Sequence, residues 1–226
     1  MILYVNGDSN SAGAEAVNDF CFAQDDPLYY ELGRQPHPDN ERVSYGCLIA
    51  NDLFAVLHCD AEAAGSNDRI LRTTREYIAD GKPDAIIIGW STWERQEWLH
   101  EGTYWQVNAG RIGHDWPNEI KDRHKEYVAN IDWAQCEEQE HEKIWNFHKE
   151  LQELEIPHLF FNCYSDFQTQ PMEDWEDCFI EPYNPDMKYY NYLKDQGLTA
   201  LPSYHYRADG HRKWAEYLMP HLTKLL

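Results

Sequence analysis

Positive charge is scarce in this sequence of 226 residues. Only 19 Lys and Arg stand against 40 Asp and Glu, which gives a formal net charge of −21. A surface with that balance repels phosphate backbones and anionic lipids, so we expect neither nucleic acid nor a membrane as a partner. The acids are explained by solubility alone and indicate no particular substrate.

Paired cysteine motifs and long apolar runs are also missing. The six cysteines are scattered with no C-x-x-C, so neither a disulfide framework nor a zinc ribbon is expected. The N-terminus has no signal-peptide pattern, and no apolar run approaches the roughly 18 residues that a membrane span requires. These absences predict a reduced, cytoplasmic protein.

The 11 histidines do not show the spacing of a metal site. There is no H-E-x-x-H motif, and His141 and His148 are seven residues apart on a strongly charged predicted helix, so we interpret the histidines as solvated. Neither G-x-G-x-x-G nor G-x-x-x-x-G-K-[ST] follows a predicted strand. We therefore expect no metal and no cofactor.

Short apolar runs do alternate with helical patterns, as in a parallel α/β sheet. Strands are predicted at 2–5, 54–57, 85–88 and 158–162, and helices at 45–53, 70–78, 135–155 and from about 209 onward. Irregular structure is predicted for 14–42, 93–135 and 165–204. Because nothing indicates a linker, we expect one domain, 1–226, with an aromatic-rich insertion at about 93–135.

Gly7-Asp8-Ser9 directly follows the first predicted strand, where open α/β sheets bind their ligands. Glycine permits a sharp turn, and a serine there can project its hydroxyl beside backbone N–H groups that bind an oxyanion. The run Val5–Gly13 resembles the first block of the SGNH (GDSL-type) hydrolases, and the rest of the chain follows the family's blocks in order. The resemblance implies a flavodoxin-like three-layer α/β/α domain that hydrolyses a small carboxylic ester through an acyl-serine intermediate. Ser9 would be the nucleophile, and Asp8 would orient its turn.

The family's oxyanion donors are matched unevenly. Gly65-Ser66-Asn67-Asp68 imitates the third block but follows the second strand, so the resemblance assigns Gly65 as a backbone donor beside the Ser9 N–H. At the third-block position, after the third strand, Ser91 replaces the family's Asn. Either the Ser91 hydroxyl or the Asn67 side-chain amide would then replace the missing donor. The alternative for Asn67 is a helix N-cap.

A serine nucleophile needs a histidine base. The family places it in D-x-x-H before the last helix, where this chain offers His205 and His211, neither with an acid three residues earlier. We favour His205 because it lies in the loop, whereas His211 is expected to be a half-exposed residue of the first helical turn. Three outcomes stay open: a Ser9–His205 dyad held by a backbone carbonyl, an acid from elsewhere such as Asp209 or Asp166, or a chain that no longer catalyses.

Tryptophans are frequent just after the third strand. Their faces pack against sugar rings and acyl chains, so Trp90 and Trp93 are candidate substrate contacts, and a carbohydrate O-acetyl ester is expected before a short-chain lipid ester. The alternative for this aromatic cluster is a small satellite core over the sheet. Arg95 is expected to pair there with Glu94 and Glu97. The competing function is a non-catalytic module on the same fold that binds a glycan or serves in assembly.

Overall fold

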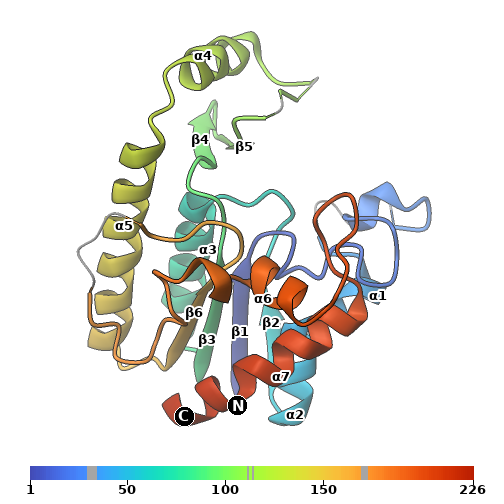
Figure 1. The fold of residues 1–226 in the computed structure, drawn as a ribbon. Helices are drawn as coiled ribbons and strands as arrows, with labels where there is room; N and C mark the ends of the chain where they lie inside the picture. Colours follow the sequence, from blue (N-terminus) through green and yellow to red (C-terminus); the bar gives the residue numbers. More distant parts are fainter. Residues whose placement is uncertain (30–34, 111, 114, 169–172) are drawn as a thin grey trace.

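The computed structural model describes residues 1–29, 35–110, 112–113, 115–168 and 173–226. No helix in these ranges has both the length and the apolar character needed to cross a membrane. In chain order the elements are β1 (Ile2–Gly7), α1 (Pro38–Glu41), α2 (Tyr45–Asp52), β2 (Val56–Cys59), α3 (Asn67–Asp80), β3 (Ala85–Trp90), β4 (Gln96–His100), β5 (Thr103–Val107), α4 (Asn118–Ala129), α5 (Trp133–Glu153), β6 (His158–Asn162), α6 (Tyr189–Asp195) and α7 (Ala208–Leu225) (Figure 1).

The central sheet has four parallel strands in the order β2-β1-β3-β6. They correspond to the four strands expected from the apolar runs, which confirms the predicted α/β class and its parallel sheet. The chain moves outward in one direction from β1 to β2 and in the other from β3 to β6. The carboxyl ends of β1 and β3 therefore flank the point where strand order reverses, the usual place for a ligand site in such sheets.

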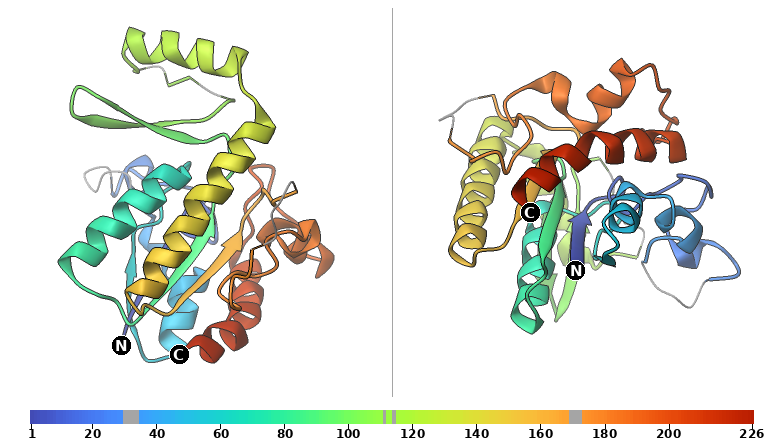
Figure 2. Two further views of the ribbon diagram at one scale, coloured as in Figure 1. Left: turned by 90° about the vertical axis from the view of Figure 1, so that its left-hand side faces the viewer. Right: turned by 90° about the horizontal axis from the view of Figure 1, so that it is seen from below.

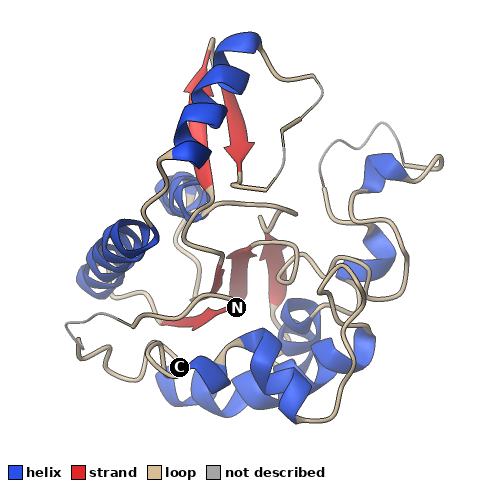
Figure 3. Ribbon diagram, turned by 45° about the horizontal axis from the view of Figure 1, so that its top comes forward, coloured by secondary structure: helices blue, strands red, loops and turns tan. Residues whose placement is uncertain are grey.

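Helices cover both faces of the sheet, as the alternation along each strand requires (Figure 3). On one face, Leu3, Val5 and Ile87 pack with α2, α6 and α7. On the other face, Tyr4 and Ile86 pack with α3 and α5. The result is the three-layer α/β/α arrangement that the sequence predicted.

All three segments predicted to be irregular contain some regular structure, which within 14–42 includes the short helix α1. Within 93–135, β4 and β5 form an antiparallel hairpin that lies with α4 beyond the carboxyl end of the sheet (Figure 2). Trp98, Val107 and Ile120 form a small core of their own there, with Trp105 and Trp116 partly buried against it. This confirms the satellite-core interpretation for that part of the cluster. Within 165–204, α6 forms because Tyr189 and Leu193, four residues apart, both reach the main core.

The ends of β1 and β3 approach too closely for side chains. Gly7 pairs with Gly89 in the sheet register. A Cβ atom on Gly89 would lie 2.7 Å from Cζ of Phe161 and 2.7 Å from Oγ of Ser11, and Gly7 has a φ of +152° that favours glycine. The two glycines thus let the turn that carries Ser9 pack directly against β3.

We expect Gly89→Ala to lower the free energy of unfolding by roughly 1–3 kcal/mol, because the added methyl group overpacks this contact. Chemical denaturation would measure the change. Gly81→Ala is the matched control, since a Cβ there meets no atom within 4 Å, and it should cost much less. Equal effects of the two substitutions would contradict the close-packing explanation.

Candidate active site

Three side chains form a continuous hydrogen-bonded chain at the carboxyl end of β1. Nε2 of His205, from the loop before α7, lies 2.8 Å from Oγ of Ser9. Nδ1 of the same ring bonds to the carboxylate of Glu15. Because a carboxylate only accepts, Nδ1 carries the proton and Nε2 is left to accept the Ser9 hydroxyl proton. This is the geometry of a serine nucleophile, a base and an orienting acid.

Glu15 was missed in the sequence because the family pattern places the acid next to the histidine. It lies six residues after Ser9 in a compact turn, with a φ of 60°, and the Ala14 N–H closes that turn by donating to the Ser9 carbonyl at 2.9 Å. Arg207 donates to the Glu15 carbonyl at 2.8 Å, which ties the turn to the start of α7. The carboxylate that meets His205 therefore comes from the same turn as Ser9.

The two acids suggested from the sequence are engaged elsewhere. Asp209 accepts the N–H of Gly210 within its own helix, and Asp166 pairs with Lys188. The structure brings neither of them to His205. Of the three outcomes left open, the contacts of His205 correspond to the second, an acid from elsewhere in the chain. That acid is Glu15 and not Asp209 or Asp166.

His211 does not reach Ser9. It is 1% exposed and lies between the rings of Tyr45 and Tyr189, so the expectation of a half-exposed residue was wrong. Burial, reinforced by the nearby charge of His205, lowers the pKa of His211 to about 3. Its ring is therefore neutral at pH 7 and serves as part of the core beneath the site.

The carboxylate of Asp8 is fully buried and neutralised by Arg95. Nη1 of Arg95 lies 3.2 Å from Oδ2 of Asp8, while the backbone and side-chain amides of Asn10 both donate to Oδ1 at 3.0 Å. The expected pairing of Arg95 with its neighbouring glutamates was wrong, since Glu97 instead pairs with Arg72 at 2.7 Å. Asp8 thus fixes the turn on both sides of Ser9.

Of the four predicted oxyanion donors, the Ser9 N–H and the side-chain amide of Asn67 donate to no other described residue. The Gly65 N–H already donates to the Glu62 carbonyl at 2.9 Å. The Ser91 hydroxyl accepts from Arg95 at 2.8 Å and turns its proton toward Asp8. The local turn and the Asp8 carboxylate have therefore taken up the donors of Gly65 and Ser91.

Asn67 has a structural position instead. It is buried, and its Oδ1 accepts the Ser91 N–H at 2.8 Å, which joins the start of α3 to the end of β3. The N-cap interpretation of Asn67 was wrong, because Ser66 caps α3 by accepting from the Arg69 N–H. Asn67 does not line the cavity described next.

A cavity of about 980 Å³ opens onto both Ser9 and His205. Its walls include Trp105 and Trp116, from the hairpin and the segment before α4, together with Tyr104, Arg69, Arg72 and Arg95. Neither aromatic contact named from the sequence reaches it. Trp105 and Trp116 were not singled out as contacts because only the folded hairpin brings them over the sheet end.

Trp90 and Trp93 are core residues, so the expected substrate contacts were wrong. Trp90 is the last residue of β3 and, by strand alternation, packs fully buried against Phe147 and Phe160. Trp93 stacks on Phe167 with ring centroids 4.7 Å apart and donates its indole N–H to a backbone carbonyl. Both rings stabilise the α5 side of the molecule.

No family model and no curated protein matches this sequence. Solved structures with a similar chain trace include TesA, at 12% identity and a TM-score of 0.49 with all of both chains covered. Others are the esterase EstA from Pseudoalteromonas sp. (10%, 0.45, 99% of this chain and 97% of that one) and a carbohydrate esterase family 2 enzyme from Corynascus thermopiles (15%, 0.45, 99% and 66%). At these identities and scores, the matches do not establish what this chain acts on.

We expect Arg95→Met to lower the free energy of unfolding by roughly 3–5 kcal/mol, because it leaves the Asp8 carboxylate buried without a counter-charge. Adding Asp8→Asn should recover part of that loss, and chemical denaturation of the single and double variants measures it. Arg42→Met is the control, since Arg42 and its partner Asp39 are exposed. An Arg95→Met variant as stable as the control would contradict the role of the pair.

Proposed function

We propose that this chain is a serine ester hydrolase of the SGNH type that acts on a small carboxylic ester. The observation that carries the proposal is the hydrogen-bonded chain Ser9–His205–Glu15 at the mouth of a cavity. A hydroxyl is a weak nucleophile unless a neighbour removes its proton, and this chain of contacts provides that neighbour and orients it.

In the proposed reaction, Ser9 Oγ attacks the ester carbonyl while His205 Nε2 takes its proton. Glu15 stabilises the imidazolium that forms, through its bond to Nδ1. His205 then gives the proton to the leaving alcohol, which departs and leaves an acyl group on Ser9. A water molecule, deprotonated by the same ring, attacks the acyl-serine, and the acid product leaves as His205 returns the proton to Ser9.

The oxyanion of this reaction would be held by the Ser9 N–H and by Arg95. Losing one donor of an oxyanion hole costs roughly 3–4 kcal/mol of transition-state stabilisation. Since the Gly65 N–H is engaged in a turn, we assign the second role to Arg95, which lines the same cavity. A guanidinium offers several N–H donors, and only Nη1 is used by Asp8 and Ser91.

The walls of the cavity favour a carbohydrate ester over a lipid ester. Indole faces pack well against sugar rings, and Trp105 and Trp116 line this cavity. Glu62, Glu97 and Gln106 line the same space beside the three arginines, and such polar walls suit hydroxyl groups better than an acyl tail. We therefore propose a carbohydrate O-acetyl ester as the substrate class.

A non-catalytic glycan-binding module is the second candidate. It is favoured by one observation: the donors of Gly65 and Ser91, both expected in the oxyanion hole, are committed to other bonds. The two candidates differ in turnover. A module of this kind would bind an acetylated oligosaccharide without releasing acetate.

We expect Ser9→Ala and His205→Ala each to lower kcat/KM for an acetylated xylo-oligosaccharide or p-nitrophenyl acetate by at least about 10³-fold, with little further loss in the double variant. Acetate release measures the effect, and far-UV circular dichroism checks the fold. Full activity in Ser9→Ala would refute the mechanism. Binding of the oligosaccharide by the unmodified protein with no acetate release would favour the second candidate.

We expect Glu15→Gln to lower kcat by roughly 10²–10⁴-fold with KM little changed, because the charge on Glu15 stabilises the imidazolium only after proton transfer begins. Asp19→Asn is the matched control, since Asp19 is a nearby exposed acid that pairs with Arg207. Steady-state kinetics of both variants separate the effects. Equal kcat values for the two would show that Glu15 is not the orienting acid.

A further inference from the structure

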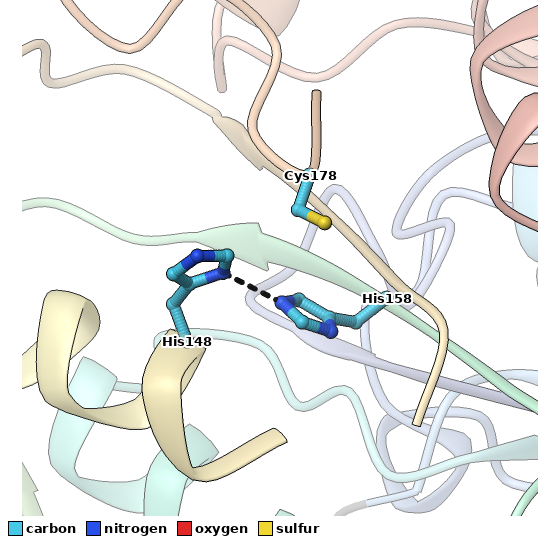
Figure 4. A group of neighbouring side chains, drawn as sticks. All are labelled: His148, His158 and Cys178. Carbon is cyan, nitrogen blue, oxygen red and sulfur yellow. Dashed lines mark hydrogen bonds between the residues drawn. The ribbon is translucent and has the colours of Figure 1, made fainter. Parts of the chain in front are cut away.

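A second group of chemically active side chains, shown in Figure 4, lies away from the cavity. His148 comes from α5, His158 begins β6, and Cys178 belongs to the segment that runs beside β6. Because the strands are parallel, the start of β6 is at the opposite end of the sheet from Ser9. The group is therefore distinct from the proposed active site.

Both imidazoles are buried, so the interpretation of the histidines as solvated was wrong for this part of the chain. His148 is 0% exposed, and His158 is buried beside it. Burial, the largest cause, lowers the pKa of each ring to about 4. A neutral imidazole is the form that binds metal ions.

The hydrogen bonds define the tautomers. Nδ1 of His158 lies 2.8 Å from the Ile156 carbonyl, which only accepts, so His158 carries its proton there and has a lone pair on Nε2. Nδ1 of His148 lies 2.8 Å from that Nε2 and must supply the shared proton. Nε2 of His148 is buried without a hydrogen-bond partner among the described residues.

We propose that Nδ1 of His148, Nε2 of His158 and Sγ of Cys178 bind one Zn²⁺ ion. The ligand atoms of the three residues all lie within 4.8 Å of one another. Tetrahedral Zn–N and Zn–S bonds of about 2.0–2.1 and 2.3 Å place ligand atoms about 3.3–3.6 Å apart. The two imidazole nitrogens, which are 2.8 Å apart, would therefore separate by about half an ångström, and Cys178 Sγ would approach them by up to about 1.2 Å. Two neutral imidazoles and one thiolate suit this ion, with a water molecule as fourth ligand.

The surroundings fit this assignment. The Ile156 carbonyl that holds His158 Nδ1 is the kind of outer partner that orients a metal-binding histidine. On binding, the His148 proton moves from Nδ1 to the unpartnered Nε2, and the Cys178 thiol gives its proton to solvent. The ion thus replaces the proton shared by the two rings.

The bound ion would join three parts of the fold. The Cys178 carbonyl accepts the Phe160 N–H at 2.7 Å, and the Ile180 N–H donates to the Phe160 carbonyl at 2.9 Å, so the segment already lies against β6. Coordination would link that segment to α5 as well. The expected effect is to cross-link these parts of the fold, and it requires no hydrolase activity.

The test is titration of the reduced, metal-free full chain with Co²⁺ as a spectroscopic substitute for Zn²⁺. We expect one equivalent to produce a sulfur-to-cobalt charge-transfer band and tetrahedral d–d bands, and Zn²⁺ to displace them and raise the melting temperature. Cys178→Ser should lose the charge-transfer band. Cys21→Ser is the control, because Cys21 lies with Glu15 and His205 in the other cluster of ligand atoms among the described residues, and it should keep the band.

No band in the unmodified protein, a band that survives Cys178→Ser, or a band lost in Cys21→Ser would each overturn the proposal. His148→Gln covers the case in which Cys178→Ser does not fold. Removing a direct ligand should weaken Co²⁺ binding by at least the 10–100-fold that loss of an outer partner costs. Unchanged affinity in His148→Gln would likewise overturn the site.

Discussion

The buried carboxylate of Asp8 is the constraint on which the candidate active site depends. It lies where the strand order reverses, and its charge must be balanced there because no water reaches it. Arg95 provides the balance from beyond β3, and the amides of Asn10 hold the other oxygen. The turn that presents Ser9 is therefore fixed to two strands at once. Ser91 and Asn67, expected to donate to an oxyanion, instead extend this network from β3 to α3.

The same turn supplies the acid, which changes how the site is assembled. Ser9 and Glu15 are brought together by a local backbone bond across the turn, so only His205 has to arrive from a distant part of the chain. The Ala208 N–H donates to the Ala16 carbonyl at 3.0 Å and, with Arg207, docks the start of α7 on that turn. An acid beside His205, where the chain has Pro202, is then unnecessary. Glu15 makes the hydrogen bond to His205 that an acid at position 202 would make.

What could be predicted from the sequence is what local pattern determines. The four strands follow from short apolar runs, and the positions of Ser9 and His205 follow from where a strand ends and a helix begins. Glu15 and Arg95 could not be placed, because each meets its partner only through tertiary contacts and no spacing rule links them. Trp90 was misread because β3 continues through it, so strand alternation directs its ring into the core. The buried histidines were misread because the many charged residues of α5 do not indicate which face of that helix packs against β6.

The most direct test of the account is intact-mass spectrometry after treatment with a fluorophosphonate, which reacts selectively with an activated serine. We expect a single adduct that maps to Ser9, is absent in Ser9→Ala, and forms far more slowly in His205→Ala and Glu15→Gln. An adduct that forms equally fast without His205 and Glu15 would show that these residues do not activate the serine. Absence of any adduct between about pH 6 and 9, where a histidine base is at least partly neutral, would contradict the proposal that the chain is a serine hydrolase.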